Sequence, residues 1–512
     1  MREKSQVVLP LDLGICIPKG DFVFKVAEIC EELDYTELFN SYVRKWRKVN
    51  PITLFEILVF GYMEHLYSGR DIEKACKTDI RFMWLLNGEP APSHATISRF
   101  QDERLTEAIE GLFYQFVEKL YEMGEVKFKN LFVDGTKIEA YANKYTFVWK
   151  KAVEKRLETL NKKIETVLPI IAERYGINTN ISLEDCYEAL VLQAQWINLT
   201  FAKGSGKRKT QLQKDIELLE GFLSKKGEYL SHLGKFNGRN SFSKTDVDAT
   251  FMHMKDDHMR NAQLKPGYNV QIGVDSEYIV ATDIFQDRND VWTLVPFLKH
   301  MEKQLGFHYP SVTADSGYES EEAYDYLKEQ KQAPYIKPQT YEKWKKRSFK
   351  QDISKRENMS YDEVNDTYTC YAGKTLSALY VKKQRSKNGY ESEVTVYECS
   401  DCSGCPCKDK CTKAKGNKRL YVSKNFISQR QISYENIMSE TGTKYRMNRS
   451  IQVEGAFGVL KNDYDFQRFL LRGKTKVKLE ILLLCFGYNI NKLHAKIQND
   501  RLRSYLFPLK TA

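Results

Sequence analysis

The sequence lacks the signals that place a chain in a membrane or direct it to secretion. Its longest apolar run, at 481–490, is far shorter than the roughly 20 residues of a membrane-spanning helix, and no signal-peptide layout precedes the first predicted helix. A Walker loop, a His-Glu-x-x-His zinc motif and a serine nucleophile elbow are also missing. We therefore expect an intracellular, cytoplasmic protein without membrane partners, whose chemistry uses none of these motifs.

The chain also lacks the composition of a disordered or disulfide-stapled protein. With 512 residues, 42% of them hydrophobic, it can fill several cores. Its eleven cysteines, in a chain with no secretion signal, favour reduced thiols or metal ligands over disulfides. Six of the eleven fall between Cys370 and Cys411.

Positive charge exceeds negative charge by only 11, but the excess is unevenly distributed. Three segments are strongly basic: 203–214, 341–356 and 408–419. Basic clusters in a chain with 12% aromatic residues favour nucleic acid as the partner. Solvated loops are the alternative explanation for each cluster taken alone.

Residues 21–124 have helical periodicity throughout. Within this region Ser93 can cap a short helix over 94–100, which exposes Ser98 and Arg99. Such a helix resembles the reading helix of a helix-turn-helix motif, in which small polar side chains and an arginine reach phosphates and base edges. A plain helical bundle with a polar exposed helix fits the same pattern.

Strands and helices alternate in the rest of the chain, which predicts an α/β core with a mixed sheet. An apolar segment leads into Asp134, two alternating strands joined by 275–277 predict an antiparallel hairpin, and a short strand ends at Asp315. The predicted domains are a helical N-terminal domain (1–125), a core in three parts (126–147, 241–340 and 441–512), a helical insertion (148–240) and a basic, Cys-rich insertion (341–440).

Three carboxylates stand out as candidate metal ligands: Asp134 and Asp315 at predicted strand ends, and Glu454 on a late helix. Carboxylates on separate elements suit two-metal phosphoryl transfer, because Mg²⁺ and Mn²⁺ prefer oxygen ligands and keep open positions for phosphate oxygens. Taken alone, Asp134 and its following glycine also fit an ordinary turn, and Glu454 with Lys461 two helical turns later fits a surface ion pair.

The order of four motifs resembles DDE transposases of bacterial insertion sequences, most closely family 1182 of the insertion-sequence-4 clan. The motifs are FVDGTKIEAYANKY around Asp134, KPGYNVQIGVD at 265–275, TADSGY around Asp315 and VEGAFGVLK around Glu454. The resemblance spans about residues 25–495. It implies a ribonuclease-H-like core in which Asp134, Asp315 and Glu454 bind Mg²⁺ or Mn²⁺.

The resemblance also implies a function and partners. The protein would bind the terminal inverted repeats of its element through the N-terminal domain, hydrolyse the end phosphodiesters and join the 3′-hydroxyl ends to target DNA, as a dimer or larger assembly at the nucleoid. Lys461 and either Arg446 or Arg449 would contact terminal phosphates. Two alternatives remain: a domesticated DNA-binding protein that no longer cuts, and a metal-dependent nuclease without strand transfer.

The chain departs from the clan signature at two positions. The signature places Tyr and Arg where this sequence has Met447 and Ser450, with Tyr445, Arg446 and Arg449 nearby. The hairpin intermediate of the clan is therefore not implied, whereas hydrolysis and strand transfer are.

The cysteine cluster has spacing compatible with structural zinc. Its candidate ligands are Cys399, Cys402, Cys405 and Cys411, with Cys370 and Cys407 nearby. Two-residue gaps let two thiolates meet one ion, as in Cys₄ zinc sites. Free thiols in a loosely packed insertion are the alternative.

Overall fold

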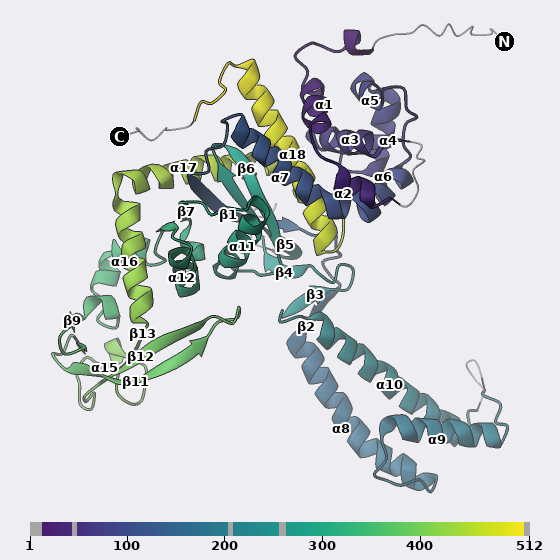
Figure 1. The fold of residues 1–512 in the computed structure, drawn as a ribbon. Helices are drawn as coiled ribbons and strands as arrows, with labels where there is room; N and C mark the ends of the chain where they lie inside the picture. Colours follow the sequence, from purple (N-terminus) through teal and green to yellow (C-terminus); the bar gives the residue numbers. More distant parts are fainter. Residues whose placement is uncertain (1–12, 43–48, 203–207, 255–262, 506–512) are drawn as a thin grey trace, which may run out of the picture. The chain divides into compact units, whose positions relative to one another are not determined.

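The computed structural model describes residues 13–42, 49–202, 208–254 and 263–505, and its contacts divide the chain into two compact units (Figure 1). Unit 1 comprises Met1–Ile138 and Asn269–Ala512, and unit 2 comprises Glu139–Tyr268. The first five residues of the basic segment 203–214 lie outside the described residues. None of the described helices is long and apolar enough to cross a membrane.

Unit 1 begins with helices, as the periodicity predicts. They are η1 (Leu13–Cys16), α1 (Val23–Glu31), α2 (Thr36–Asn40), α3 (Pro51–Met63), α4 (Gly69–Thr78), α5 (Ile80–Leu86), α6 (His94–Phe100), the π-helical turn η2 (Gln101–Leu105) and α7 (Thr106–Glu122). In α3 the Asn50 side chain accepts a hydrogen bond from the Ile52 amide and Pro51 occupies the first turn, a favoured way to start a helix. Ser93 caps α6 as predicted, by accepting from the Thr96 amide.

The main sheet of unit 1 is mixed. Its strands are β1 (Asn130–Glu139), β5 (Leu264–Asp275), β6 (Tyr278–Phe285), β7 (Ser311–Ala314) and β8 (Ala333–Ile336). The order across the sheet is β5-β1-β7-β8, with β6 paired to β5 as an outer strand. β1, β7 and β8 run parallel, whereas β5 and β6 form the predicted antiparallel hairpin. The mixed α/β class is thus confirmed.

The hairpin turn uses residues that tolerate positive φ poorly. Ser276 and Glu277 have φ of 55° and 75°, so the two-residue connection between Asp275 and Tyr278 has the left-handed conformation of the tight turns that join twisted strands. Neither residue is glycine or asparagine. The surrounding contacts of Unit 1 hold this strained turn in place, because the Glu277 amide donates to the Gln452 side chain.

Helices connect and cover the strands of the main sheet. They are η3 (Asp290–Trp292), α11 (Leu294–Leu305), η4 (Ser316–Tyr318), α12 (Glu321–Glu329), α16 (Lys424–Met438), α17 (Glu440–Gly458), the π-helical turn η6 (Val459–Asp463) and α18 (Lys474–Gln498). α18 packs against α3, α7 and β6 (Figure 1), and residues 481–490 are completely or almost completely buried. The apolar run too short for a membrane is therefore the core of a buried helix.

The Cys-rich segment of unit 1 forms a second, antiparallel sheet. After α13 (Tyr341–Trp344), α14 (Arg347–Lys350) and η5 (Arg356–Asn358), its strands are β9 (Ser360–Asp362), β10 (Thr367–Thr369), β11 (Thr375–Arg385), β12 (Glu391–Cys399) and β13 (Arg419–Val422), with α15 (Lys408–Cys411) between the last two. The strand order is β13-β12-β11-β10-β9. The sequence shows only fragments of strand character here.

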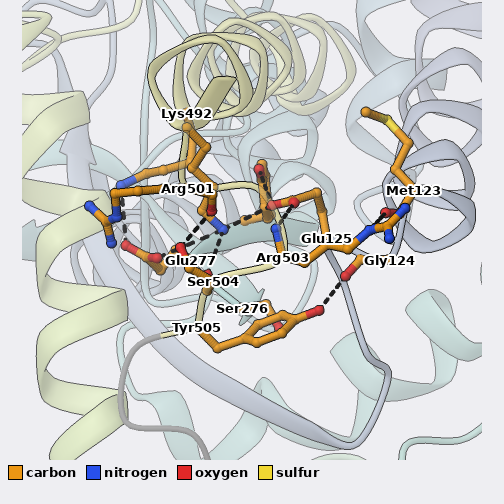
Figure 2. Close-up of polar contacts among 12 residues, drawn as sticks. Met123, Gly124, Glu125, Ser276, Glu277, Lys492, Arg501, Arg503, Ser504 and Tyr505 are labelled. Carbon is orange, nitrogen blue, oxygen red and sulfur yellow. Dashed lines mark hydrogen bonds and ion pairs between the residues drawn. The ribbon is translucent and has the colours of Figure 1, made fainter. Parts of the chain in front are cut away.

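A buried charged network ties the last described residues of unit 1 to the start of its sheet (Figure 2). The ammonium group of Lys496 lies 2.9 Å from a carboxylate oxygen of Glu125, and these side chains are 3% and 0% exposed. Glu125 also accepts from the Tyr278 hydroxyl and the Arg503 amide. Burial alone would raise the pKa of Glu125, but the hydrogen bonds from the Arg503 amide, Lys496 and the Tyr278 hydroxyl together lower it, which favours the carboxylate form.

Unit 2 is built on three long helices. Its elements are β2 (Phe147–Trp149), α8 (Lys150–Arg174), α9 (Leu183–Trp196), α10 (Gln211–Lys235), β3 (Ser241–Ser243) and β4 (Thr250–His253), and the first residues of β5 pair with β4. β2 and β3 pair antiparallel at the base of the helices. The helices share a core that includes Leu160, Cys186, Leu190, Ile216 and Leu219. The helical insertion predicted at 148–240 falls inside this unit.

Candidate active site

The strand register brings the two predicted aspartates to the same place. β1 and β7 are parallel, and the last residues that pair between them are Val133 and Ala314. Asp134 and Asp315 are the next residues of the two strands, so they come directly after the same pair. The prediction that Asp134 ends its strand is wrong: β1 continues to Glu139, because β5 pairs with it on the other side, and no Asp-Gly turn forms. Asp134 instead stands where the pairing with β7 stops.

Asp134 lies in a partly buried, charged environment. Its side chain is 22% exposed, and its Oδ2 lies 2.8 Å from a guanidinium nitrogen of Arg449 on α17. Burial raises the pKa of the Asp134 carboxyl, and the charges of Asp315 and Asp290 add to this rise. Arg449 and the Gly135 amide, which donates to Oδ1 over 2.8 Å, oppose it. Like charges therefore converge on Asp134, as a cation-binding position requires.

Asp290 is a site residue that the sequence interpretation missed. It begins η3, and its carboxylate accepts from the side-chain amides of Asn269 (2.8 Å) and Gln271 (3.1 Å). A Cβ built on Gly317, two residues after Asp315, would lie 3.6 Å from Asp290 Oδ2. The available signal was the polar run QDRND that directly follows the strand at 278–285.

Gly135 and Gln271 fix the backbone beside Asp134. Gln271 is completely buried, donates to Asn269 and Asp290, and accepts from the Tyr318 hydroxyl. A Cβ on Gly135 would lie 2.1 Å from Gln271 Nε2, so position 135 has no room for a side chain. Because each polar atom of this amide is engaged, Gln271 cannot swing aside without breaking hydrogen bonds.

Gly135→Ala should therefore lower the thermal midpoint of unfolding, by an amount equivalent to about 1–3 kcal/mol for an overpacked site. The matched control is Gly455→Ala, in an exposed turn of α17 next to Glu454, where a Cβ meets nothing within 4 Å. That substitution should raise stability by roughly 0.5–1 kcal/mol, because alanine favours helix. Equal midpoints for the two variants in differential scanning fluorimetry would contradict the packing argument.

Glu454 is on α17, as predicted, and its side chain is engaged by a neighbouring residue of the same helix. It is exposed, and Ser450 Oγ donates to its Oε1 over 3.0 Å. Within the described ranges, no three His, Cys, Asp or Glu side chains gather closely enough to hold a metal ion. The structure thus brings Asp134 close to Asp315 and Arg449, and among the described residues Glu454 does not complete a three-ligand group with the two aspartates.

The predicted DNA-contacting residues occupy different surroundings. Arg446 donates to Thr443 and lies 6.0 Å from the centre of the Tyr341 ring. Ser98 and Arg99 are exposed on α6. Lys461 lies in the π-helical turn η6, a kind of irregularity that is frequent at functional sites.

Six cysteines line one pocket beside the second sheet. They are Cys370, Cys399, Cys402, Cys405, Cys407 and Cys411. All six are free thiols, and the Cys402 sulfur accepts from the Lys418 amide over 3.3 Å. Burial and the neighbouring Cys402 raise the pKa of the Cys399 thiol. The four predicted zinc ligands therefore face a common space, together with two further thiols.

Comparison with protein families finds two similarities to transposases. Residues 369–494 match a family described as a transposase DDE domain, and residues 11–103 match a transposase domain known as DUF772. The first match contains Glu454 and Lys461 but neither Asp134 nor Asp315. A comparison with curated proteins found no match. The two family matches indicate a DNA transposase of the DDE type.

Proposed function

We propose that this protein is the transposase of a bacterial insertion sequence, of family 1182 in the insertion-sequence-4 clan. It binds the terminal inverted repeats, hydrolyses the end phosphodiesters and joins the freed 3′-hydroxyls to target DNA. The observation that carries the proposal is the register of β1 and β7, which sets Asp134 beside Asp315 in a chain that matches a transposase DDE domain. A central β1 between an antiparallel hairpin and two parallel strands supports a ribonuclease-H-like core.

Asp134, Asp315 and Glu454 would hold Mg²⁺ or Mn²⁺. The donor set fits, because all three offer carboxylate oxygens, the ligands that these hard ions prefer. Bound ions would activate the attacking oxygen and stabilise the leaving oxygen of an in-line displacement. The proposal requires Glu454 to turn from Ser450 toward the aspartates, since these side chains form no three-ligand group in the described part of the chain.

The basic residues of unit 1 would position the DNA. Arg449 already lies at the Asp134 carboxylate, so its guanidinium is placed to meet a phosphate oxygen at the same site. Lys461 and Arg446 would add phosphate contacts, and α6, with Ser98 and Arg99, would contact the terminal repeats. Two ends must be joined in one event, which calls for a dimer or a larger assembly on DNA.

The direct test supplies the purified protein with labelled duplexes from the DNA that flanks its coding sequence, a target plasmid and Mg²⁺. We expect cut ends with 3′-hydroxyls and joined products, and neither after chelation of the metal. Cleavage without joined products would identify the nuclease alternative. Complexes that neither cut nor join with Mg²⁺ or Mn²⁺ would identify the non-cutting DNA-binding alternative.

We also propose that the cysteine pocket holds structural zinc, with Cys399, Cys402, Cys405 and Cys411 as ligands. The thiol donor set fits zinc, although no three thiols are arranged as a metal-binding group within the described ranges. Elemental analysis should find about one zinc per chain, and Cys402→Ser should remove most of it. The control is Cys186→Ser, a buried cysteine in the core of unit 2. Less than about half an equivalent in the wild type would exclude a tightly held structural ion.

A further inference from the structure

Unit 2 has a cationic groove between its two longest helices. α8 and α10 run antiparallel, since Arg174 at the end of α8 pairs with Asp215 near the start of α10. Toward the opposite ends of these helices a groove opens, lined by Ala152, Lys155, Arg156, Thr159, Leu160, Lys163, Lys225 and Tyr229. Four of these eight residues are cationic and none is acidic. Figure 1 shows the two helices side by side.

The four cations of this groove are available to an external anion. Lys155, Arg156, Lys163 and Lys225 are all exposed, and within the described ranges none of their charged side-chain groups makes a hydrogen bond or an ion pair within 4 Å. Charge complementarity on a folded surface normally pairs such groups with nearby carboxylates. Here that pairing is absent although carboxylates are close in sequence.

The neighbouring acids are engaged by other lysines. Glu154 lies 3.8 Å from Lys150, and Glu158 lies 2.7 Å from Lys162. On α10, Glu228 lies 3.6 Å from Lys244. These pairs partly neutralise the acids, although Glu158 also interacts with the charge of Lys155, and the residues that line the groove carry only positive charge.

The spacing of the cations suits a sugar-phosphate backbone. Lys155, Thr159 and Lys163 follow each other at four-residue intervals, so they form one stripe along α8 about 12 Å long. One DNA strand presents a phosphate about every 3.4 Å along the duplex axis, so the stripe can meet several phosphates. Lys225 and Tyr229 line the groove from α10.

We propose that this groove binds the phosphodiester backbone of duplex DNA, independently of sequence. The inference rests on the proposed transposase function, for which it names a DNA-contacting surface in unit 2. Backbone contacts by lysine and arginine supply affinity and register without reading bases. The groove would therefore add affinity for any duplex, including the target, rather than selectivity for the element ends.

Two adjacent pairs of lysines allow a matched test in the full-length protein. The groove variant is Lys163→Gln with Lys225→Gln, and the control is Lys162→Gln with Lys226→Gln. The control residues are the direct sequence neighbours, and they already pair with Glu158 (2.7 Å) and Glu184 (3.1 Å). Both variants carry the same charge change on the same two helices, and thermal melts of both should show intact folding.

The measurement is the affinity for a fluorescent duplex of arbitrary sequence over a series of salt concentrations. Loss of two phosphate contacts should reduce the slope of log affinity against log salt by about 1.8 and weaken binding roughly 10- to 100-fold at 0.1 M salt. The control should stay within about twofold of wild type, because its lysines are neutralised by their partners. Equal affinity and slope for both variants and the wild type would overturn the proposal, as would an equal loss in the control.

Two further results separate this proposal from others. Binding of an RNA duplex should be weakened by the groove variant as much as DNA binding or less. If the groove variant weakened RNA binding alone, the proposal that the groove binds duplex DNA would be overturned. Cleavage and joining of element ends by the wild type tests the proposed function separately. If wild type binds DNA through the groove but never cuts with Mg²⁺, the transposase function fails while the groove stands.

Discussion

Asp134→Asn is expected to reduce metal-dependent cleavage and joining of DNA ends by at least about 100- to 1,000-fold, because an amide carries no charge to bind a divalent ion. Asp134 combines the three properties that a metal ligand at this site requires. It follows the last paired residue of β1 and β7, it lies beside Asp315, and its carboxylate already binds a cation, the guanidinium of Arg449.

The same substitution should leave the fold intact. Burial, together with Asp315 and Asp290, raises the pKa of Asp134, so the folded protein disfavours the charge at this position. A group with a raised folded-state pKa contributes most stability below its unfolded pKa, when it is neutral, and loses that contribution as pH rises. Asparagine is neutral at every pH, so the thermal midpoint at neutral pH should change by no more than a few degrees.

The control for this prediction is Asp500→Asn. Asp500 is exposed and has a φ of 53°, a left-handed conformation that asparagine adopts readily. We expect this variant to cleave and join DNA as wild type does. An Asp134→Asn protein that retains full Mg²⁺-dependent cleavage would remove Asp134 from the proposed catalytic set.

The parts of the site that the sequence predicts are those set by local pattern. The apolar segment before Asp134 and the short strand before Asp315 are strands because their residues alternate or run apolar, and adjacency then follows from parallel pairing. The turn at 275–277 and the buried helix containing 481–490 were predictable for the same reason. Each of these features needs information from fewer than about 25 consecutive residues.

The rest depends on contacts between distant segments. Arg449 reaches Asp134 because α17 packs against β7 and β8, and nothing in the sequence around either residue specifies that packing. Asp290 is held by Asn269 and Gln271, polar residues inside a buried strand, where alternation predicts only which face they occupy. A local pattern thus locates single acids but not their partners.

The cysteine pocket illustrates the same limit. The spacing of Cys399, Cys402 and Cys405 marks a cluster, whereas Cys370 joins it through strand pairing. Leu376 pairs with Cys399 across β11 and β12, which brings the turn after β10 beside the later thiols. Cys370 therefore joins the cluster through the antiparallel pairing of the strands, which the cysteine spacing does not predict.

The buried network of Lys496 supports the largest stability prediction. The Lys496 side chain is 3% exposed, and its ammonium group contacts Glu125, the Ser504 carbonyl at 3.3 Å and, at 3.8 Å, Glu277. Lys496→Met would remove the ion-pair partner of Glu125, which is fully buried. Removing one member of a buried pair typically costs about 3–5 kcal/mol, since the remaining charge has lost both water and partner.

We therefore expect Lys496→Met to lower the thermal midpoint of unit 1 by about 4–6 °C. Lys492→Met is the matched control: it lies one turn earlier on α18, is 30% exposed and contacts Glu277 at 3.5 Å, so it should cost less than about 1 kcal/mol. Adding Glu125→Gln to Lys496→Met removes the unpaired charge and should recover much of the lost stability.

Glu125 also accepts a hydrogen bond from the Arg503 amide, so the loss of Lys496 should loosen the chain around that residue. Proteolysis near 499–505 should therefore be faster in the single variant than in the wild type, with a smaller increase in the double variant. Equal thermal midpoints for the Lys496→Met and Lys492→Met proteins would show that the buried Lys496–Glu125 pair contributes no more stability than the exposed pair of Lys492 with Glu277.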